Sequence, residues 1–90
     1  MLKEVVGIGN SVLYQKVGDE ILLLNMVNQR YVSLDRVGAD IWELLMRHGD
    51  AETVAKLITS DYNIDEATAL RDVESFVSEL LAADFLTRVN

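Results

Sequence analysis

The side chains that could act as acids, bases or nucleophiles are few, and their spacing does not assemble a catalytic group. His48 is the only histidine of the 90-residue chain, and it directly precedes Gly49, where a helix is expected to end. As a general base His48 would need a nucleophile and an orienting partner, and the sequence indicates neither. The chain contains no cysteine, which excludes a thiol nucleophile, a thiolate zinc site and a disulfide. We therefore expect a protein that is not an enzyme.

Acidic side chains come closest to a metal-binding pattern in the segment DYNIDEATALRD. Asp61, Asn63 and Asp65 stand at the first, third and fifth positions of a calcium-binding loop. The sixth position, which needs glycine for a sharp turn, is Glu66, and the twelfth is Asp72 where the pattern has a bidentate glutamate. A helix that begins at Asp65 would also prevent the segment from wrapping around an ion. We expect no metal and no cofactor.

Negative charge is concentrated in the second half of the chain and argues against nucleic acid as a partner. The formal net charge is −7, of which residues 1–48 carry −1 and residues 49–90 carry −6. The segment 65–85 holds six acidic residues and a single basic one, Arg71. Such a surface repels phosphate groups, so we expect neither nucleic acid nor an anionic membrane as a partner. A winged-helix DNA-binding regulator is the less favoured alternative, and an ordinary solvated helix surface also explains the charge.

The apolar residues are not arranged for membrane insertion or export. No stretch approaches the roughly 20 consecutive apolar residues that cross a bilayer. The N-terminal segment MLKEVVGIGNSV lacks the apolar run of a signal peptide, and the absence of cysteine suits a reducing compartment. We expect a cytoplasmic location.

Three strands are expected in the first third of the chain. Residues 11–17 and 20–27 are apolar and β-branched, with the turn signal Gly-Asp between them, and residues 30–34 follow a second short turn. Connections this short require an antiparallel meander. The run Ile21 to Leu24 does not alternate, which predicts a central strand that is covered on both faces.

Three helices are expected after the strands, and a capping aspartate precedes each one. Asp35, Asp50 and Asp65 precede apolar residues at helical spacing, and Gly49 ends the first helix. The residues expected to face inward are Val37, Ile41, Leu44, Leu45 and His48 in the first helix, Val54, Leu57, Ile58 and Tyr62 in the second, and Leu70, Val73, Val77, Leu80 and Leu81 in the third.

This order of elements predicts an α+β domain in the form of a winged helix-turn-helix, with a three-stranded antiparallel sheet followed by three helices. Ninety residues are enough for one hydrophobic core. We therefore expect a single domain over residues 1–90, with strands at about 11–34 and helices at about 35–86.

The third strand, RYVSL, is the segment with the clearest capacity to bind a partner. As the last strand of a meander it lies at an edge, where backbone N–H and C=O groups can pair with an added peptide strand. The segment has no proline, and its only charge is Arg30 at the start. Alternation places Val32 and Leu34 on one face, and Tyr31 and Ser33 on the other. The alternative is an ordinary edge that is hidden in a dimer or beneath the third helix; we expect a monomer or a weak dimer.

The segment LLLNMVNQRYVSLDRVGADIWELL resembles the middle of proteins in the PQQ-biosynthesis protein D family. That pattern has an apolar strand, a turn, a tyrosine-containing strand that ends in Leu-Asn or Leu-Asp, then a glycine and Ile-Trp within a helix. The corresponding residues here are Tyr31, Leu34, Asp35, Gly38, Ile41 and Trp42. The closing helices also resemble the family, with Tyr62 before an acidic cap, and Asp72 and Val73 before Phe76. The chain departs from the pattern at Ala83-Asp84, where members often have glycine.

This resemblance implies a leader-peptide recognition element, which binds the leader of a ribosomally synthesised precursor peptide as an added strand. The expected location is the cleft between the third strand and the third helix. A free-standing chain with the Ile-Trp helix is most similar to the leader-binding protein of lasso-peptide biosynthesis. Its implied partners are the precursor leader, a leader peptidase and an ATP-dependent cyclase. A peptide chaperone of PQQ or of another modified-peptide pathway is the alternative.

The residues expected to contact the leader come from the edge strand and the third helix. Small Ala69 is expected to leave room for an apolar leader side chain, and Asp72 or Glu74 to pair with a basic one. The same helix stripe is also typical of a pure core, and Trp42 fits either the core or a surface anchor for an enzyme. Gly38 suggests close packing against the sheet. The expected contact residues are Arg30, Tyr31, Val32, Ser33, Leu34, Ala69, Leu70, Asp72, Val73, Glu74 and Val77.

Overall fold

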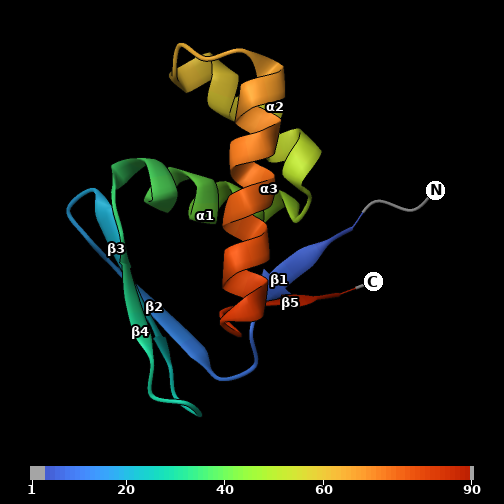
Figure 1. Ribbon diagram of the computed structural model, residues 1–90. Helices are drawn as coiled ribbons and strands as arrows, with labels where there is room; N and C mark the ends of the chain where they lie inside the picture. The colour runs from blue at the N-terminus through green and yellow to red at the C-terminus, as the bar shows by residue number, and fades with distance from the viewer. Residues whose placement is uncertain (1–3, 90) are drawn as a thin grey trace.

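The computed structural model describes residues 4–89 (Figure 1). Residues 1–3 and 90, which the expected domain included, lie outside the described residues. The elements in chain order are β1 (Val6–Ile8), β2 (Val12–Val17), β3 (Glu20–Asn25), β4 (Tyr31–Leu34), α1 (Arg36–His48), α2 (Ala51–Asp61), α3 (Glu66–Ala82) and β5 (Leu86–Arg88). The expected α+β class, with a three-stranded sheet followed by three helices, is confirmed.

The three-stranded sheet is an antiparallel meander in the order β2-β3-β4. The central position of β3 is therefore confirmed, but the prediction that both of its faces are covered is wrong. Ile21 and Leu23 are buried, whereas Leu22 and Leu24 are 42% and 37% exposed. The helices cover only one face of the sheet, so an apolar residue at every position does not mean burial on both sides. β3 also ends at Asn25, two residues before the expected Val27.

Local hydrogen bonds begin each helix as expected. Asp35 accepts from the Gly38 N–H at 2.9 Å, and the other two capping aspartates make the equivalent bonds at 3.0 and 3.2 Å. Gly49 ends α1 with φ of 83°, in the left-handed region that a residue without Cβ adopts at low cost. Each of these contacts joins residues close in sequence, which explains why the sequence predicted them.

The C-terminal end of α3 differs from the expectation that helix continues to about residue 86. The helix ends at Ala82, and Asp84 adopts the left-handed conformation with φ of 63°. The Phe85 N–H donates to Leu80 O at 2.9 Å and the Asp84 N–H donates to Leu81 O at 3.1 Å. This pair of bonds is a Schellman turn, which reverses the chain after a helix. Asp84 therefore holds the left-handed position.

A second sheet follows from this reversal and was not predicted. β5 pairs antiparallel with β1, with Gly7 opposite Thr87. In Figure 1 the three-stranded sheet lies to the left of α3 and the β1–β5 pair to its right. Strands of three residues carry too little sequence pattern to be recognised, and here their partners are about 80 positions apart.

The core lies between the inner face of the sheet and the helices. Its centre is Trp42, which is fully buried, so the core alternative for this residue is the one observed. The Tyr14 ring meets the Trp42 ring edge to face, with centroids 5.5 Å apart. Val37, Leu57 and His48 were expected to face inward, but they are exposed. Among residues 4–89, no helix is long and apolar enough to span a bilayer.

Candidate functional site

The outer edge of β4 is open. β4 pairs with β3 on one side, and within residues 4–89 no strand pairs with its other side. The Asn25 N–H donates to Arg30 O at 2.9 Å, so this N–H and this carbonyl face each other at the start of the β3–β4 ladder. Backbone groups alternate in direction along an antiparallel strand. Those of Val32 and Leu34 therefore face β3, and those of Tyr31 and Ser33 face the open edge.

Two cavities follow β4 on the side where α3 lies, and we call them together the β4–α3 cleft. The first has a volume of about 470 Å³, and the second about 370 Å³. The first is lined by Gln29, Arg30, Tyr31, Val32, Glu79, Leu80, Ala83 and Phe85. The second is lined by Ser33, Leu34, Asp35, Val37, Gly38, Ile41, Asp72 and Phe76.

The cleft has apolar walls and a charged rim. Val32 and Leu34 turn toward the helices, as the alternation predicted, while Tyr31 is 74% exposed on the outer face. The α3 wall is one helical stripe of Asp72, Phe76, Leu80 and neighbouring residues at spacings of three and four. The site therefore combines backbone hydrogen-bonding groups with apolar pockets, the two components that bind an extended peptide.

The second half of the cleft is held by a short junction between β4 and α1. Asp35 directly follows Leu34 and caps α1. A Cβ at Gly38 would lie 3.4 Å from Leu34 Cβ and 3.5 Å from Phe76 Cε1. The close packing expected at Gly38 is thus present, and it brings the end of β4, the start of α1 and the middle of α3 together. β4 is therefore joined to the capped start of α1 without an intervening loop.

The sequence-predicted site residues divide among three regions: the cleft, the core and a separate cavity. All five strand residues, Arg30 to Leu34, line the cleft, but among the six helix residues only Asp72 does. Ala69 and Val73 are buried, at 1% and 0% exposure, so their side chains face the core and leave no room for a ligand.

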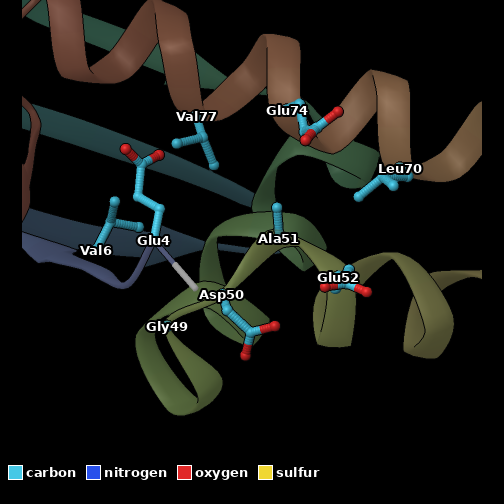
Figure 2. A pocket seen from close by; sticks show the side chains of 9 residues that line it. All are labelled: Glu4, Val6, Gly49, Asp50, Ala51, Glu52, Leu70, Glu74 and Val77. Carbon is cyan, nitrogen blue, oxygen red and sulfur yellow. The ribbon is translucent and has the colours of Figure 1, made fainter. Parts of the chain in front are cut away.

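The other three helix residues lie at a different place. Leu70, Glu74 and Val77 line a separate cavity of about 130 Å³, together with Glu4, Val6 and residues 49–52, which end α1 and begin α2 (Figure 2). The structure therefore does not bring them to the open edge of β4.

Sequence reasoning missed Phe76, Glu79, Leu80 and Ala83 as cleft residues. Phe76 and Leu80 lie four positions apart, which is a signal for one face of a helix. This signal did not distinguish the cleft stripe from the neighbouring stripe that packs against the rest of the protein. α3 is apolar on more than one side, and the choice between stripes depends on where α2 lies.

The perturbed ionisable groups lie outside the cleft. The Tyr62 hydroxyl donates to Asp40 Oδ2 at 2.5 Å, and this hydrogen bond raises the pKa of Tyr62. Hydrogen bonds from the Thr68 hydroxyl and N–H lower the pKa of Asp65 below 3.8. Both interactions are structural: the first joins α1 to α2, and the second caps α3. Within the described part of the chain, no three acidic or histidine side chains gather to hold a metal ion.

Comparison with known proteins identifies the class. Residues 20–86 match the family described as coenzyme PQQ synthesis protein D (PqqD), and the chain belongs to this family. The resemblance inferred from the sequence is confirmed. No curated protein matches the chain.

Two solved structures are similar over nearly the whole chain. The structure described as "TbiB1 in Complex with the TbiA(beta) Leader Peptide" is 31% identical, with a TM-score of 0.84, and the match covers 89% of this chain and 93% of that one. The structure described as "Lasso peptide synthetase B1 complexed with the leader peptide" is 21% identical, with a TM-score of 0.84, and covers 91% and 96%. The second likeness concerns the fold alone.

Proposed function

We propose that this protein is a non-catalytic binding domain for the leader of a ribosomally synthesised precursor peptide. The leader adds to the open edge of β4 as an extra strand and places alternate side chains in the β4–α3 cleft. The observation that carries the proposal is the position of this edge, because its outward backbone groups and two apolar cavities border the same space. Membership of the PqqD family and the similarity to a protein solved with a leader peptide support it.

The proposed contact residues keep the strand part of the sequence prediction and change the helix part. Arg30, Tyr31, Val32, Ser33 and Leu34 supply the edge and its flanking side chains. On α3 the contact residues are Asp72, which the sequence predicted, and Phe76, Glu79, Leu80 and Ala83, which the cleft adds. A basic leader residue is expected to pair with Asp72 or Glu79 at the rim, which contributes modestly because both carboxylates are exposed.

The bound leader is delivered to maturation enzymes in the cytoplasm. A leader peptidase and an ATP-dependent cyclase of a lasso-peptide pathway are the favoured recipients, because the chain with its Ile41-Trp42 helix resembles the leader-binding protein of lasso-peptide biosynthesis. A chaperone role in PQQ or another modified-peptide pathway is the alternative. Adding the purified leader peptidase of the lasso-peptide pathway to the leader complex tests this choice: faster leader cleavage when the protein is present supports the lasso pathway, and unchanged cleavage favours the alternative.

The experiment that tests leader binding is fluorescence anisotropy of the labelled leader of the precursor encoded beside this gene. The protein is titrated into the peptide at two salt concentrations, with a labelled DNA duplex of random sequence as a control. Saturable binding that changes little with salt, and no binding of the duplex, is the expected result. A folded protein that does not bind the leader up to about 100 µM refutes the proposal.

A further inference from the structure

Asn25 is a buried polar residue, 5% exposed, whose side chain joins two distant parts of the chain. Its Oδ1 accepts from the Val27 N–H at 2.9 Å and from the Asn28 N–H at 3.2 Å. Its Nδ2 donates to Asp84 O at 2.9 Å, across 59 positions of sequence. A buried amide that uses both ends in this way specifies a single arrangement of the groups it joins.

The first group is the turn that leads into β4. Besides the two bonds to Asn25, the Arg30 N–H donates to Asn28 Oδ1 at 2.9 Å, and Gln29 adopts a left-handed φ of 60°. The turn is thus built on side-chain hydrogen bonds from two asparagines, and Asn25 anchors it to the sheet. Because Gln29 and Arg30 line the larger cavity, the conformation of this turn determines the shape of one wall of the cleft.

The second group is the turn that ends α3. The Asp84 carbonyl that receives the Asn25 bond lies between Ala83 and Phe85, which line the opposite wall of the same cavity. The bond from Asn25 to Asp84 therefore connects the two walls of the larger cavity. Gly9 approaches this carbonyl independently of Asn25, since a Cβ at Gly9 would lie only 2.9 Å from Asp84 O.

We infer that Asn25 is a positioning residue for the β4–α3 cleft: it holds the start of the edge strand at a set distance from the end of α3. The consequence of this positioning rests on the proposed function: the cleft already has its binding shape before the leader arrives. A wall that is not held must be ordered on binding, and that cost lowers the apparent affinity. Asn25 itself does not line the cleft, so it acts through the turn and the helix end.

The variant Asn25→Asp tests the bond to Asp84 separately from the bonds that Asn25 makes within the turn. Its carboxylate can still accept from Val27 and Asn28, but it has no N–H to donate to Asp84 O. We expect the leader dissociation constant to rise about fivefold or more, the equivalent of one lost hydrogen bond. The matched control is Ile58→Val, which removes one buried methylene between the helices and destabilises the fold without touching either cleft wall. Its leader affinity is expected to equal that of the wild type.

A distance measurement tests the inference without any leader. The chain contains no cysteine, so spin labels can be placed uniquely with Tyr31→Cys on β4 and Ser78→Cys on α3, both at exposed positions. The distribution of distances between the labels is expected to broaden in the Asn25→Asp background and to stay narrow in the Ile58→Val background. Gly9→Ala, which pushes the Asp84 carbonyl from its other side, is expected to shift the same distribution.

The outcomes separate this inference from the proposed function. A folded Asn25→Asp protein with a leader affinity within twofold of the wild type, or an unchanged distance distribution, overturns the inference and leaves leader binding intact. A wild type that does not bind the leader overturns the proposed function, while the distance distributions still decide whether Asn25 sets the cleft. If Asn25→Asp does not fold, Gly9→Ala decides: a normal distribution and normal affinity overturn the inference.

Discussion

Proline at Ser33 is the perturbation that most directly tests strand addition. The Asn25–Arg30 hydrogen bond places the Ser33 N–H on the open edge of β4, whereas the Val32 N–H faces β3. Proline is tolerated on an edge strand when its missing N–H would face solvent. The variant Ser33→Pro is therefore expected to fold, because its ladder with β3 stays complete.

The expected loss of leader affinity can be estimated from the bonds removed. One backbone hydrogen bond to the leader contributes about 0.5–1.5 kcal/mol, and the proline ring also blocks the approach of the neighbouring leader residue. Two lost bonds give about 2 kcal/mol, on the order of a 30-fold rise in the dissociation constant. Leader anisotropy measures this change, and urea unfolding measures the stability of the variant.

Two matched variants make the result decisive. Ser33→Ala keeps the N–H and removes only an exposed hydroxyl, so it is expected to lose far less leader affinity than Ser33→Pro. Val32→Pro removes the N–H that faces β3, so it is expected to destabilise the fold through the loss of a ladder hydrogen bond. If Ser33→Pro is folded and binds the leader as tightly as Ser33→Ala does, the leader does not add to this edge and the reasoning is refuted.

Three further predictions concern the α3 helix and its two ends. Phe76→Ala removes part of a cleft wall and is expected to weaken leader binding about tenfold. Leu70→Ala changes the separate cavity and is expected to leave leader affinity unchanged. The reverse pattern in the anisotropy titration would mean that the leader contacts the sequence-predicted face of α3. Asp84→Gly relieves a left-handed conformation and is expected to raise the free energy of unfolding in urea by about 0.5–1 kcal/mol, and a lower stability would contradict the Schellman assignment. Asp65 has a pKa lowered by Thr68, so its capping contribution is present above pH 3.8 and is lost as pH falls through the lower folded-state pKa. The difference in unfolding free energy between the wild type and Asp65→Ala is therefore expected to shrink below pH 3.8, and a difference that is constant with pH would contradict this account.

The sequence alone determined the features that depend on neighbours along the chain. Asp35, Asp50 and Asp65 begin helices because each side chain bonds an N–H three positions later, and Gly49 ends α1 because it lacks a Cβ. The short turns force three consecutive strands into a meander with β4 at its edge. The strand half of the site follows from these local facts.

The helix half of the site was decided only by tertiary structure. α3 presents two adjacent apolar stripes, and periodicity finds both but does not say which one α2 covers. The packing of α2 buries Ala69 and Val73 and leaves the stripe of Phe76 and Leu80 beside β4. Tertiary structure also decided the β1–β5 pair and the bond from Asn25 to Asp84, because each joins residues at least 59 positions apart. Such contacts leave no pattern in the local sequence, since their energy depends on where the whole chain places both partners.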